Sequence, residues 1–179
     1  MANILLAVTG SISAYKAADI TSQLTKLGHQ VKVLMTPAAT AFITPLTLQV
    51  LSKNPVGLDV MIEEDPQRIE HIDIGKETDL FLVAPASANT IAKLAMGLAD
   101  NMVTSTALAL PQGTKKILAP AMNTKMLEHP ATQRNLKLLQ DYGYQIIQPR
   151  HATLACGDQG SGALATVESI VKAVKEHCL

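Results

Sequence analysis

Cysteine is scarce in this sequence, which has only Cys156 and Cys178 among its 179 residues. Two cysteines form no disulfide framework and lack the partner spacing of a zinc site, so any special cysteine is expected to act as a reduced thiol. Charge is not in excess either, because 15 Lys and Arg residues balance 15 Asp and Glu residues. No basic run reaches five residues, so nucleic acid and anionic membranes are not predicted partners. Small-molecule ligands are favoured.

A membrane-spanning run and a signal peptide are also missing. The apolar start, residues 3–8, is too short to cross a bilayer, has no basic segment before it and leads into a turn and a helix. We therefore expect a cytoplasmic protein. No repeat, low-complexity tract or long linker divides the chain, and 47% hydrophobic residues suffice for one sizeable core. The sequence predicts a single domain over residues 1–179.

Short apolar runs alternate with helical patterns along the chain. Each run is nearly continuous in apolar residues, which is typical of parallel strands covered on both faces. The apolar spacing over residues 17–27 predicts a helix that ends at Gly28. A last helix is predicted after Thr166, with Cys178 packing on it or lying at its frayed end. The predicted fold class is α/β, a doubly wound parallel sheet with helices on both faces, and ligands are expected beyond the carboxyl ends of its strands. The predicted strands are Ile4–Val8, Gln30–Met35, Leu80–Ala84, Lys116–Ala119 and Tyr144–Ile147.

The first predicted strand runs directly into Gly10-Ser11-Ile12-Ser13 at the start of a helical pattern. Backbone N–H groups and hydroxyls at such a turn suit a phosphate. A dinucleotide fold would need G-x-G-x-x-G here and an acid after the second strand, where Thr36-Pro37 stands, and the lysine pattern of a P-loop is missing too. The turn therefore favours a single terminal phosphate over NAD or ATP. The alternative is an ordinary Gly-Ser loop.

Small polar residues recur where two further strands are predicted to end. The third strand leads into Pro85-Ala86-Ser87-Ala88-Asn89-Thr90 and the fourth into Pro120-Ala121-Met122-Asn123. Two Pro-Ala turns at one edge of a sheet indicate a functional site. The alternative is ordinary helix capping by Ser87, Asn89 and Asn123.

Together these segments form an ordered motif series that resembles the flavin-containing cysteine decarboxylases. The resemblance runs from residue 10 to about residue 162, and five motifs in one order are specific where any one would not be. The motifs are Gly10-Ser11-Ile12-Ser13-Ala14-Tyr15-Lys16, His71-Ile72-Asp73, Pro85 to Thr90, Pro120 to Asn123 and Ala155-Cys156-Gly157-Asp158.

The resemblance implies a Rossmann-like subunit that binds FMN and assembles as a trimer or a multiple of trimers, with flavin and substrate held at subunit contacts. It implies that the phosphate side of FMN is held by Gly10, Ser11 and Ile12, that Thr36 contacts the cofactor, and that Ser87, Ala88, Asn89, Thr90 and Ala121 line it.

The same resemblance assigns catalytic roles. His71 is similar to the family's base, although by itself it would be read as a surface histidine. Asn123 matches the residue that holds the substrate carboxylate, and Cys156 matches the cysteine that completes reduction of the intermediate. Thr153, Leu154 and Ala155 fall in the segment that closes over substrate.

The motif set is most similar to members that convert 4′-phosphopantothenoylcysteine to 4′-phosphopantetheine in coenzyme A biosynthesis. A cysteine carboxylate cannot simply lose CO₂, because the electron pair left on carbon would have no acceptor. Oxidation of the CH₂–SH group to a thioaldehyde by FMN would create such an acceptor. Reduction of the enethiolate formed on loss of CO₂ would then leave no net oxidation. At His71 a neutral imidazole suits proton removal near neutral pH.

Two positions depart from the family pattern, because relatives commonly have an acidic residue where Gln159 stands and an arginine where Ala163 stands. The synthetase fused to many relatives is absent, so we expect it as a separate protein. One alternative is a peptidyl-cysteine oxidative decarboxylase, which would lack the reducing cysteine that Cys156 matches. A flavin prenyltransferase would lack His71, Asn123 and Cys156. A non-catalytic FMN-binding regulatory subunit is the third alternative, since a shared fold does not prove activity.

Overall fold

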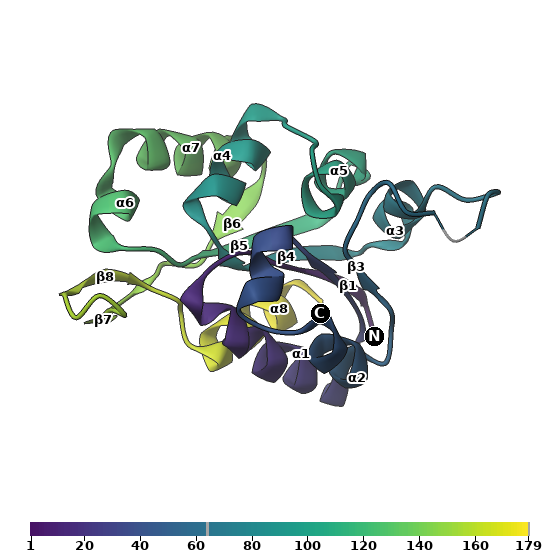
Figure 1. Cartoon of the computed structure of the whole chain (residues 1–179), viewed down its shortest axis with the longest axis horizontal. Helices are drawn as coiled ribbons and strands as arrows, with labels where there is room; N and C mark the ends of the chain where they lie inside the picture. Colours follow the sequence, from purple (N-terminus) through teal and green to yellow (C-terminus); the bar gives the residue numbers. More distant parts are fainter. Residues whose placement is uncertain (64, 179) are drawn as a thin grey trace.

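Six parallel strands form one sheet in the order β3-β2-β1-β4-β5-β6. The computed structural model describes residues 1–63 and 65–178. The sheet lies between two layers of helices, and a two-stranded antiparallel hairpin, β7-β8, projects from one end (Figure 1). The sheet strands are β1 (Asn3–Val8), β2 (Gln30–Met35), β3 (Val56–Gly57), β4 (Leu80–Ala86), β5 (Lys115–Pro120) and β6 (Tyr144–Ile146), and those of the hairpin are β7 (Arg150–Thr153) and β8 (Gln159–Ala163).

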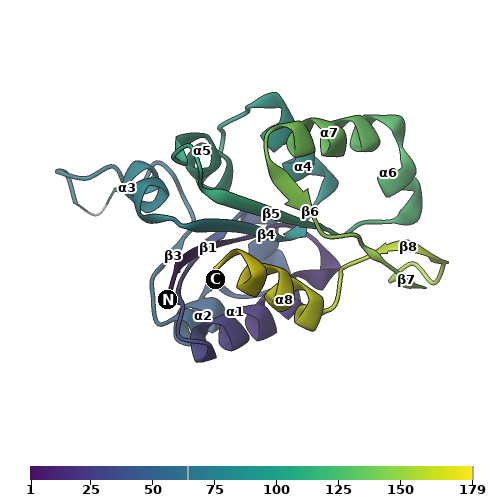
Figure 2. The ribbon, with the colours of Figure 1, turned by 180° about the vertical axis from the view of Figure 1, so that it is seen from behind.

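Helices cover both faces of the sheet, as the two opposite views show (Figures 1 and 2). One layer contains α1 (Ala17–Lys26), α2 (Pro45–Ser52) and α8 (Val167–His177), and two short 3₁₀ helices, η1 (Ile12–Lys16) and η2 (Pro37–Ala41), precede the first two. The other layer contains α3 (Glu70–Glu77), α4 (Ala88–Met96), α5 (Met102–Ala109), α6 (Thr124–Glu128) and α7 (Pro130–Asp141).

Two hydrophobic clusters hold these layers together. Along β1, Ile4 and Leu6 pack into the cluster beneath α1 and α8, whereas Leu5 and Ala7 pack into the cluster beneath α4 and α5. Successive side chains of a strand point to opposite faces, so a strand buried on both sides must be apolar throughout. Each fully buried Leu or Ile contributes about 1.5–3 kcal/mol to stability. The continuous apolar runs of the sequence are the direct result.

The predicted α/β class and doubly wound sheet are confirmed. All five predicted strands are present with ends that differ by at most two residues, and the helices predicted after Gly10 and Thr166 are η1 with α1, and α8. Cys178 is half-buried and packs against the first cluster. Two features were not predicted: β3, because a strand of two residues has no periodicity, and the hairpin β7-β8. Within the described residues, no helix is long and apolar enough to cross a membrane.

Candidate active site

A cavity of about 650 Å³ lies at the carboxyl edge of the sheet. The segments after β1, β4 and β5 line it, and the hairpin β7-β8 lies along its side. The segment after β1 contributes Gly10, Ser11, Ile12 and Ser13, the one after β4 contributes Ser87 and Ala88, and the one after β5 contributes Ala121, Met122 and Asn123. Three segments that are distant in the sequence therefore meet at one hollow, as the parallel topology requires.

Thr9 joins two of these segments. Its buried hydroxyl donates to the carbonyl oxygen of Pro85 at 2.6 Å and accepts from the backbone N–H of Ser87 at 2.8 Å. A single side chain at the end of β1 thus fixes the segment after β4. The sequence analysis gave Thr9 no role, although a threonine that ends an otherwise apolar strand is a usable signal.

The segment after β1 packs closely on the segment after β2 and leaves its own backbone accessible to a ligand. Ser11 is buried and begins η1, with its Oγ accepting from the N–H of Ser13 at 3.3 Å. A Cβ atom at Gly10 would lie 2.6 Å from the Cβ of Ala38, so only glycine fits there without a shift. Beside it, Thr36 is buried and its Oγ1 has no hydrogen-bond partner in the described chain. Such an orphaned hydroxyl is typical of a site that a polar ligand completes.

Ser87 and Asn123 both cap helices and line the cavity. The Oγ of Ser87 accepts from the N–H of Thr90 at 3.3 Å, and the Oδ1 of Asn123 accepts from the N–H of Lys125 at 2.9 Å. Capping and a role at the site are therefore compatible rather than alternative. Because its oxygen is used by α6, Asn123 presents its Nδ2 donor toward the cavity.

That amide reaches the thiol of the hairpin. Asn123 Nδ2 donates to Cys156 Sγ at 3.4 Å, and Cys156 Sγ donates to Asp158 Oδ2 at 3.4 Å. Between the hairpin strands, the N–H of Leu154 donates to the carbonyl oxygen of Asp158 at 2.8 Å, which closes the turn that carries the exposed Cys156. An amide, a thiol and a carboxylate are thus linked at the mouth of the cavity.

Two glycines allow the hairpin to sit this close. A Cβ at Gly162 would lie 2.1 Å from the carbonyl oxygen of Met122, and a Cβ at Gly160 would lie 2.2 Å from Thr124 Oγ1. The N–H of Met122 donates to the carbonyl oxygen of Gly162 at 3.0 Å. The small residues of β8 therefore dock the hairpin on the segment after β5, which brings Cys156 to Asn123.

Most of the predicted site residues meet at this cavity. Those that line it are Gly10, Ser11, Ile12, Ser87, Ala88, Ala121, Asn123, Thr153, Leu154, Ala155 and Cys156. Thr36, Asn89 and Thr90 lie in the adjoining segments but do not line it. Lining residues to which sequence reasoning gave no role include Tyr15, Lys16, Phe42, Met126 and Arg150. Lys16 is part of the Gly10–Lys16 motif, whereas no motif in the sequence includes Arg150.

His71 is not brought to the cavity within one copy of the chain. It lies on α3, at the opposite end of the molecule from the hairpin in both views (Figures 1 and 2). Its Nδ1 is buried and has no hydrogen-bond partner in the described chain. One copy therefore groups Asn123 with Cys156 but leaves the predicted base elsewhere.

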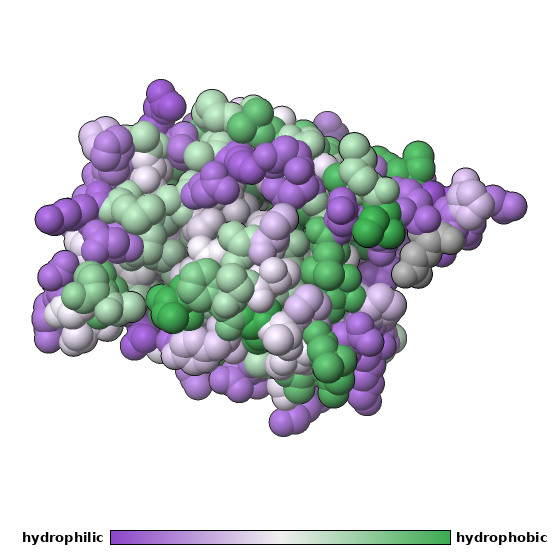
Figure 3. Space-filling view, viewed as in Figure 1, coloured by the Kyte–Doolittle hydropathy of each residue, from purple (hydrophilic) through white to green (hydrophobic). Residues whose placement is uncertain are grey.

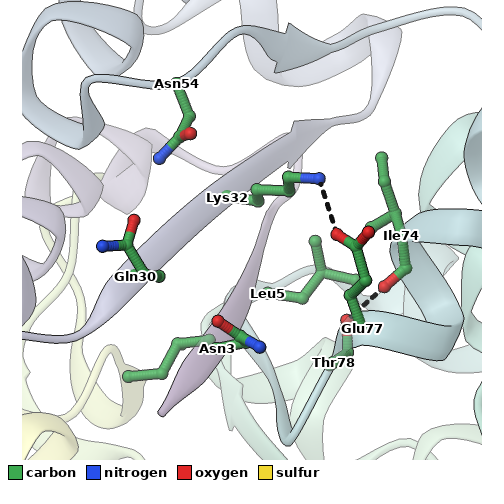
Figure 4. A pocket seen from close by; sticks show the side chains of 9 residues that line it. Asn3, Leu5, Gln30, Lys32, Asn54, Ile74, Glu77 and Thr78 are labelled. Carbon is green, nitrogen blue, oxygen red and sulfur yellow. Dashed lines mark hydrogen bonds and ion pairs between the residues drawn. The ribbon is translucent and has the colours of Figure 1, made fainter. Parts of the chain in front are cut away.

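A smaller hollow at the amino edge of the sheet differs in character. It has a volume of about 190 Å³, and its side chains include Asn3, Lys32 and Glu77 (Figure 4). Lys32 Nζ and Glu77 Oε2 pair at 3.2 Å, so its charges neutralise each other. Among the described residues that line this hollow there is no thiol or imidazole. The chemically versatile groups thus gather at the carboxyl edge.

Comparison with known proteins agrees with this geometry. The profile of the flavoprotein family matches residues 1–179. A probable phosphopantothenoylcysteine decarboxylase of Streptococcus mutans is 64% identical, with 97% of each chain covered. The coenzyme A biosynthesis bifunctional protein CoaBC of Bacillus subtilis is 47% identical over 98% of this chain, which spans 43% of that longer protein.

Solved structures show the same fold. A cysteine-to-serine mutant of PPC decarboxylase complexed with pantothenoylaminoethenethiol superposes with a TM-score of 0.88 at 31% identity, covering 98% of this chain and 97% of that one. The FMN binding protein AtHal3 superposes with a TM-score of 0.84 at 31% identity, covering 98% and 95%.

Proposed function

This chain belongs to the flavoprotein family, and we propose that it is an FMN-dependent decarboxylase that converts 4′-phosphopantothenoylcysteine to 4′-phosphopantetheine in coenzyme A biosynthesis. The observation that carries the proposal is the contact of the Asn123 amide with the Cys156 thiol at a cavity lined by a Gly-Ser turn. The similarity to a probable phosphopantothenoylcysteine decarboxylase supports the same substrate.

The residues of the cavity fit FMN. The close turn at Gly10 and Ser11 admits a phosphate to backbone N–H groups, and we propose the unpaired hydroxyl of Thr36, in the adjoining segment, as a further donor. When bound, the flavin supplies two-electron oxidation and reduction of the substrate thiol carbon. We assign its binding to Gly10, Ser11, Ile12, Thr36, Ser87, Ala88, Asn89, Thr90 and Ala121.

Asn123 binds the carboxylate that leaves as CO₂. Its Nδ2 donor faces the cavity because its Oδ1 is held by the N–H of Lys125. A neutral amide orients the carboxylate without a full positive charge, which would stabilise the starting carboxylate and oppose its loss. Thr153, Leu154 and Ala155 of the hairpin complete the substrate side of the cavity.

Cys156 is the acid that completes reduction of the intermediate. Its thiol is held between the Nδ2 of Asn123 and the carboxylate of Asp158. The first contact joins the sulfur to the amide that we propose for the substrate carboxylate, and the second joins the S–H group to the Asp158 carboxylate. These contacts support a role for the thiol as the acid that acts after decarboxylation.

His71 is proposed as the base that removes a proton during oxidation of the thiol, and a second copy of the chain must supply it. Exposed apolar side chains support assembly: Phe42, Leu46 and Val50 lie on or near α2, and Ile69 immediately precedes α3. Apolar atoms gather over α2 on the face shown in Figure 3. Such patches mark contact surfaces. A trimer would bury them and bring α3 of one copy to the cavity of another.

The mass of the product distinguishes the proposed activity from its alternatives. We propose to incubate the purified protein with 4′-phosphopantothenoylcysteine and to follow the product by mass. Loss of CO₂ alone is the expected result. Loss of CO₂ and two hydrogens would indicate an oxidative decarboxylase, and no change in mass with flavin bound would indicate a regulatory subunit.

A further inference from the structure

The charged residues that line the cavity are basic. They are Lys16 and Arg150, and no acidic side chain lines it within the described residues, whereas the Asp158 carboxylate lies at its mouth. Neither cation forms a salt bridge in that part of the chain. Two unpaired cations in one partly enclosed hollow favour an anionic ligand with more than one charge.

Arg150 is held by the hairpin itself. It is the first residue of β7 and lies opposite Ala163 of β8. Its Nε donates to the carbonyl oxygen of Leu164 at 3.0 Å, which uses one of the five guanidinium donors. The guanidinium is therefore fixed at its base while most of its donors stay available.

Lys16 lines the same cavity. It ends η1, is half-buried, and has its Nζ 5.9 Å from the centre of the Tyr15 ring. The pKa of the Glu168 carboxyl is lowered by its own backbone N–H, by the Thr166 hydroxyl and, to a smaller degree, by the charges of Arg150 and Lys16. The two cations therefore act on one region, at the start of α8.

We propose that Lys16 and Arg150 bind the phosphate group of the substrate and so determine specificity for a phosphorylated thiol acid. This inference rests on the function proposed above. It assigns the residues that bind the phosphate end of the substrate, which lies far from the reacting thiol. A phosphate monoester dianion matches a fork of guanidinium donors beside an ammonium group.

The position of Arg150 favours the substrate phosphate over that of FMN. Arg150 begins β7, whereas Cys156 lies in the turn that follows this strand. The substrate carries its phosphate at one end of the long pantothenoyl arm and its thiol at the other, so its two ends need separate sites. The Gly10–Ile12 turn, by contrast, offers a separate set of donors for the flavin phosphate.

The test compares two substrates, 4′-phosphopantothenoylcysteine and its dephosphorylated form, with wild type and Arg150→Gln. Loss of a charged hydrogen bond costs about 1.5–3 kcal/mol, so the preference in kcat/KM for the phosphorylated substrate should fall about 10-fold or more in the variant. Arg134→Gln, an exposed arginine on α7 outside this cavity, is the matched control and should keep the wild-type preference.

The flavin content of the purified variant, measured by visible absorbance, shows whether Arg150 binds the phosphate of the substrate or that of FMN. Wild-type flavin content with a reduced substrate preference supports the proposal. Loss of FMN from Arg150→Gln, or an unchanged preference, would overturn it.

Titration calorimetry with 4′-phosphopantetheine and with pantetheine measures how much the phosphate contributes to the binding free energy, without turnover. Tighter binding of the phosphorylated compound to wild type, and not to the variant, is the expected result even if catalysis fails. Turnover of neither substrate by wild type would count against the proposed function. Equal binding of the two compounds by wild type would count against this inference alone.

Discussion

Asn123 Nδ2 and Cys156 Sγ lie 3.4 Å apart although 33 residues separate them in the sequence. The contact exists because α6 takes the amide oxygen of Asn123, and because Gly160 and Gly162 let the hairpin approach the segment after β5. The proposed carboxylate-binding donor and the proposed proton-donating thiol are thereby held together by the fold itself.

Asn123→Asp should weaken substrate binding. The new carboxylate repels the substrate carboxylate and replaces the Nδ2 donor, at a cost of about 2 kcal/mol or more, so KM should rise about 30-fold. Steady-state kinetics measure it. Asn101→Asp is the matched control, because Asn101 caps α5 in the same way, outside the cavity. An unchanged KM for the Asn123 variant would contradict the carboxylate assignment.

Cys156→Ser should separate decarboxylation from reduction. CO₂ should still be released, but the oxidised enethiol should accumulate and the flavin should stay bleached, because a hydroxyl is a far weaker acid than a thiol. Mass analysis and visible absorbance follow both products. Cys178→Ser, at the end of α8, is the control and should behave as wild type. Normal turnover by Cys156→Ser would remove the thiol from the mechanism.

His71→Asn should bind FMN without bleaching it on addition of substrate, since no base removes the proton that thiol oxidation releases. Stopped-flow absorbance at the flavin band measures this step. Bleaching at the wild-type rate would show that another group is the base.

Mixing His71→Asn with Cys156→Ser tests whether two copies build one site. If α3 of one copy serves the cavity of another, denaturing and refolding the two inactive variants together should restore activity in roughly one site in four. Each variant refolded alone is the control. An inactive mixture of properly assembled protein would place His71 and Cys156 in the same copy, against the distance between α3 and the hairpin.

Gly162→Ala should loosen the hairpin. Its φ of +139° disfavours a side chain, and a Cβ would lie 2.1 Å from the carbonyl oxygen of Met122. We expect a loss of about 1–3 kcal/mol and faster proteolysis between residues 150 and 163. Gly113→Ala has a φ of +94° but open space around its Cβ, so it reports backbone strain alone. Equal effects of the two changes in urea unfolding and proteolysis would show that docking of the hairpin does not depend on Gly162.

The sheet was predictable because buried parallel strands leave continuous apolar runs. β2 was located to the residue, and β1 within one. The hairpin was not predictable, because β8 reads Gln-Gly-Ser-Gly-Ala and holds its place through backbone contacts that need small residues rather than through an apolar pattern. Short strands of this kind leave little periodicity.

The site was predictable where motifs follow strands, as at Ser11, Ala121 and Asn123. Arg150 was not, because a lone arginine carries no motif and enters the cavity only through its ladder position opposite Ala163. Thr9 was missed for a similar reason, since its role depends on a contact with Pro85 that lies 76 residues away. The resemblance named His71, but nothing in the sequence indicated that α3 lies at the opposite end of the molecule from the hairpin.

Titration of the protein with FMN is the decisive measurement, because every proposed step needs bound flavin. We expect yellow protein, or colourless protein that takes up one FMN per chain with a shift of the visible flavin bands, and Gly10→Ala should impair this uptake because its Cβ would meet Ala38. Protein that is isolated without flavin and leaves the FMN spectrum and fluorescence unchanged throughout the titration would refute FMN binding and the decarboxylase proposed from it.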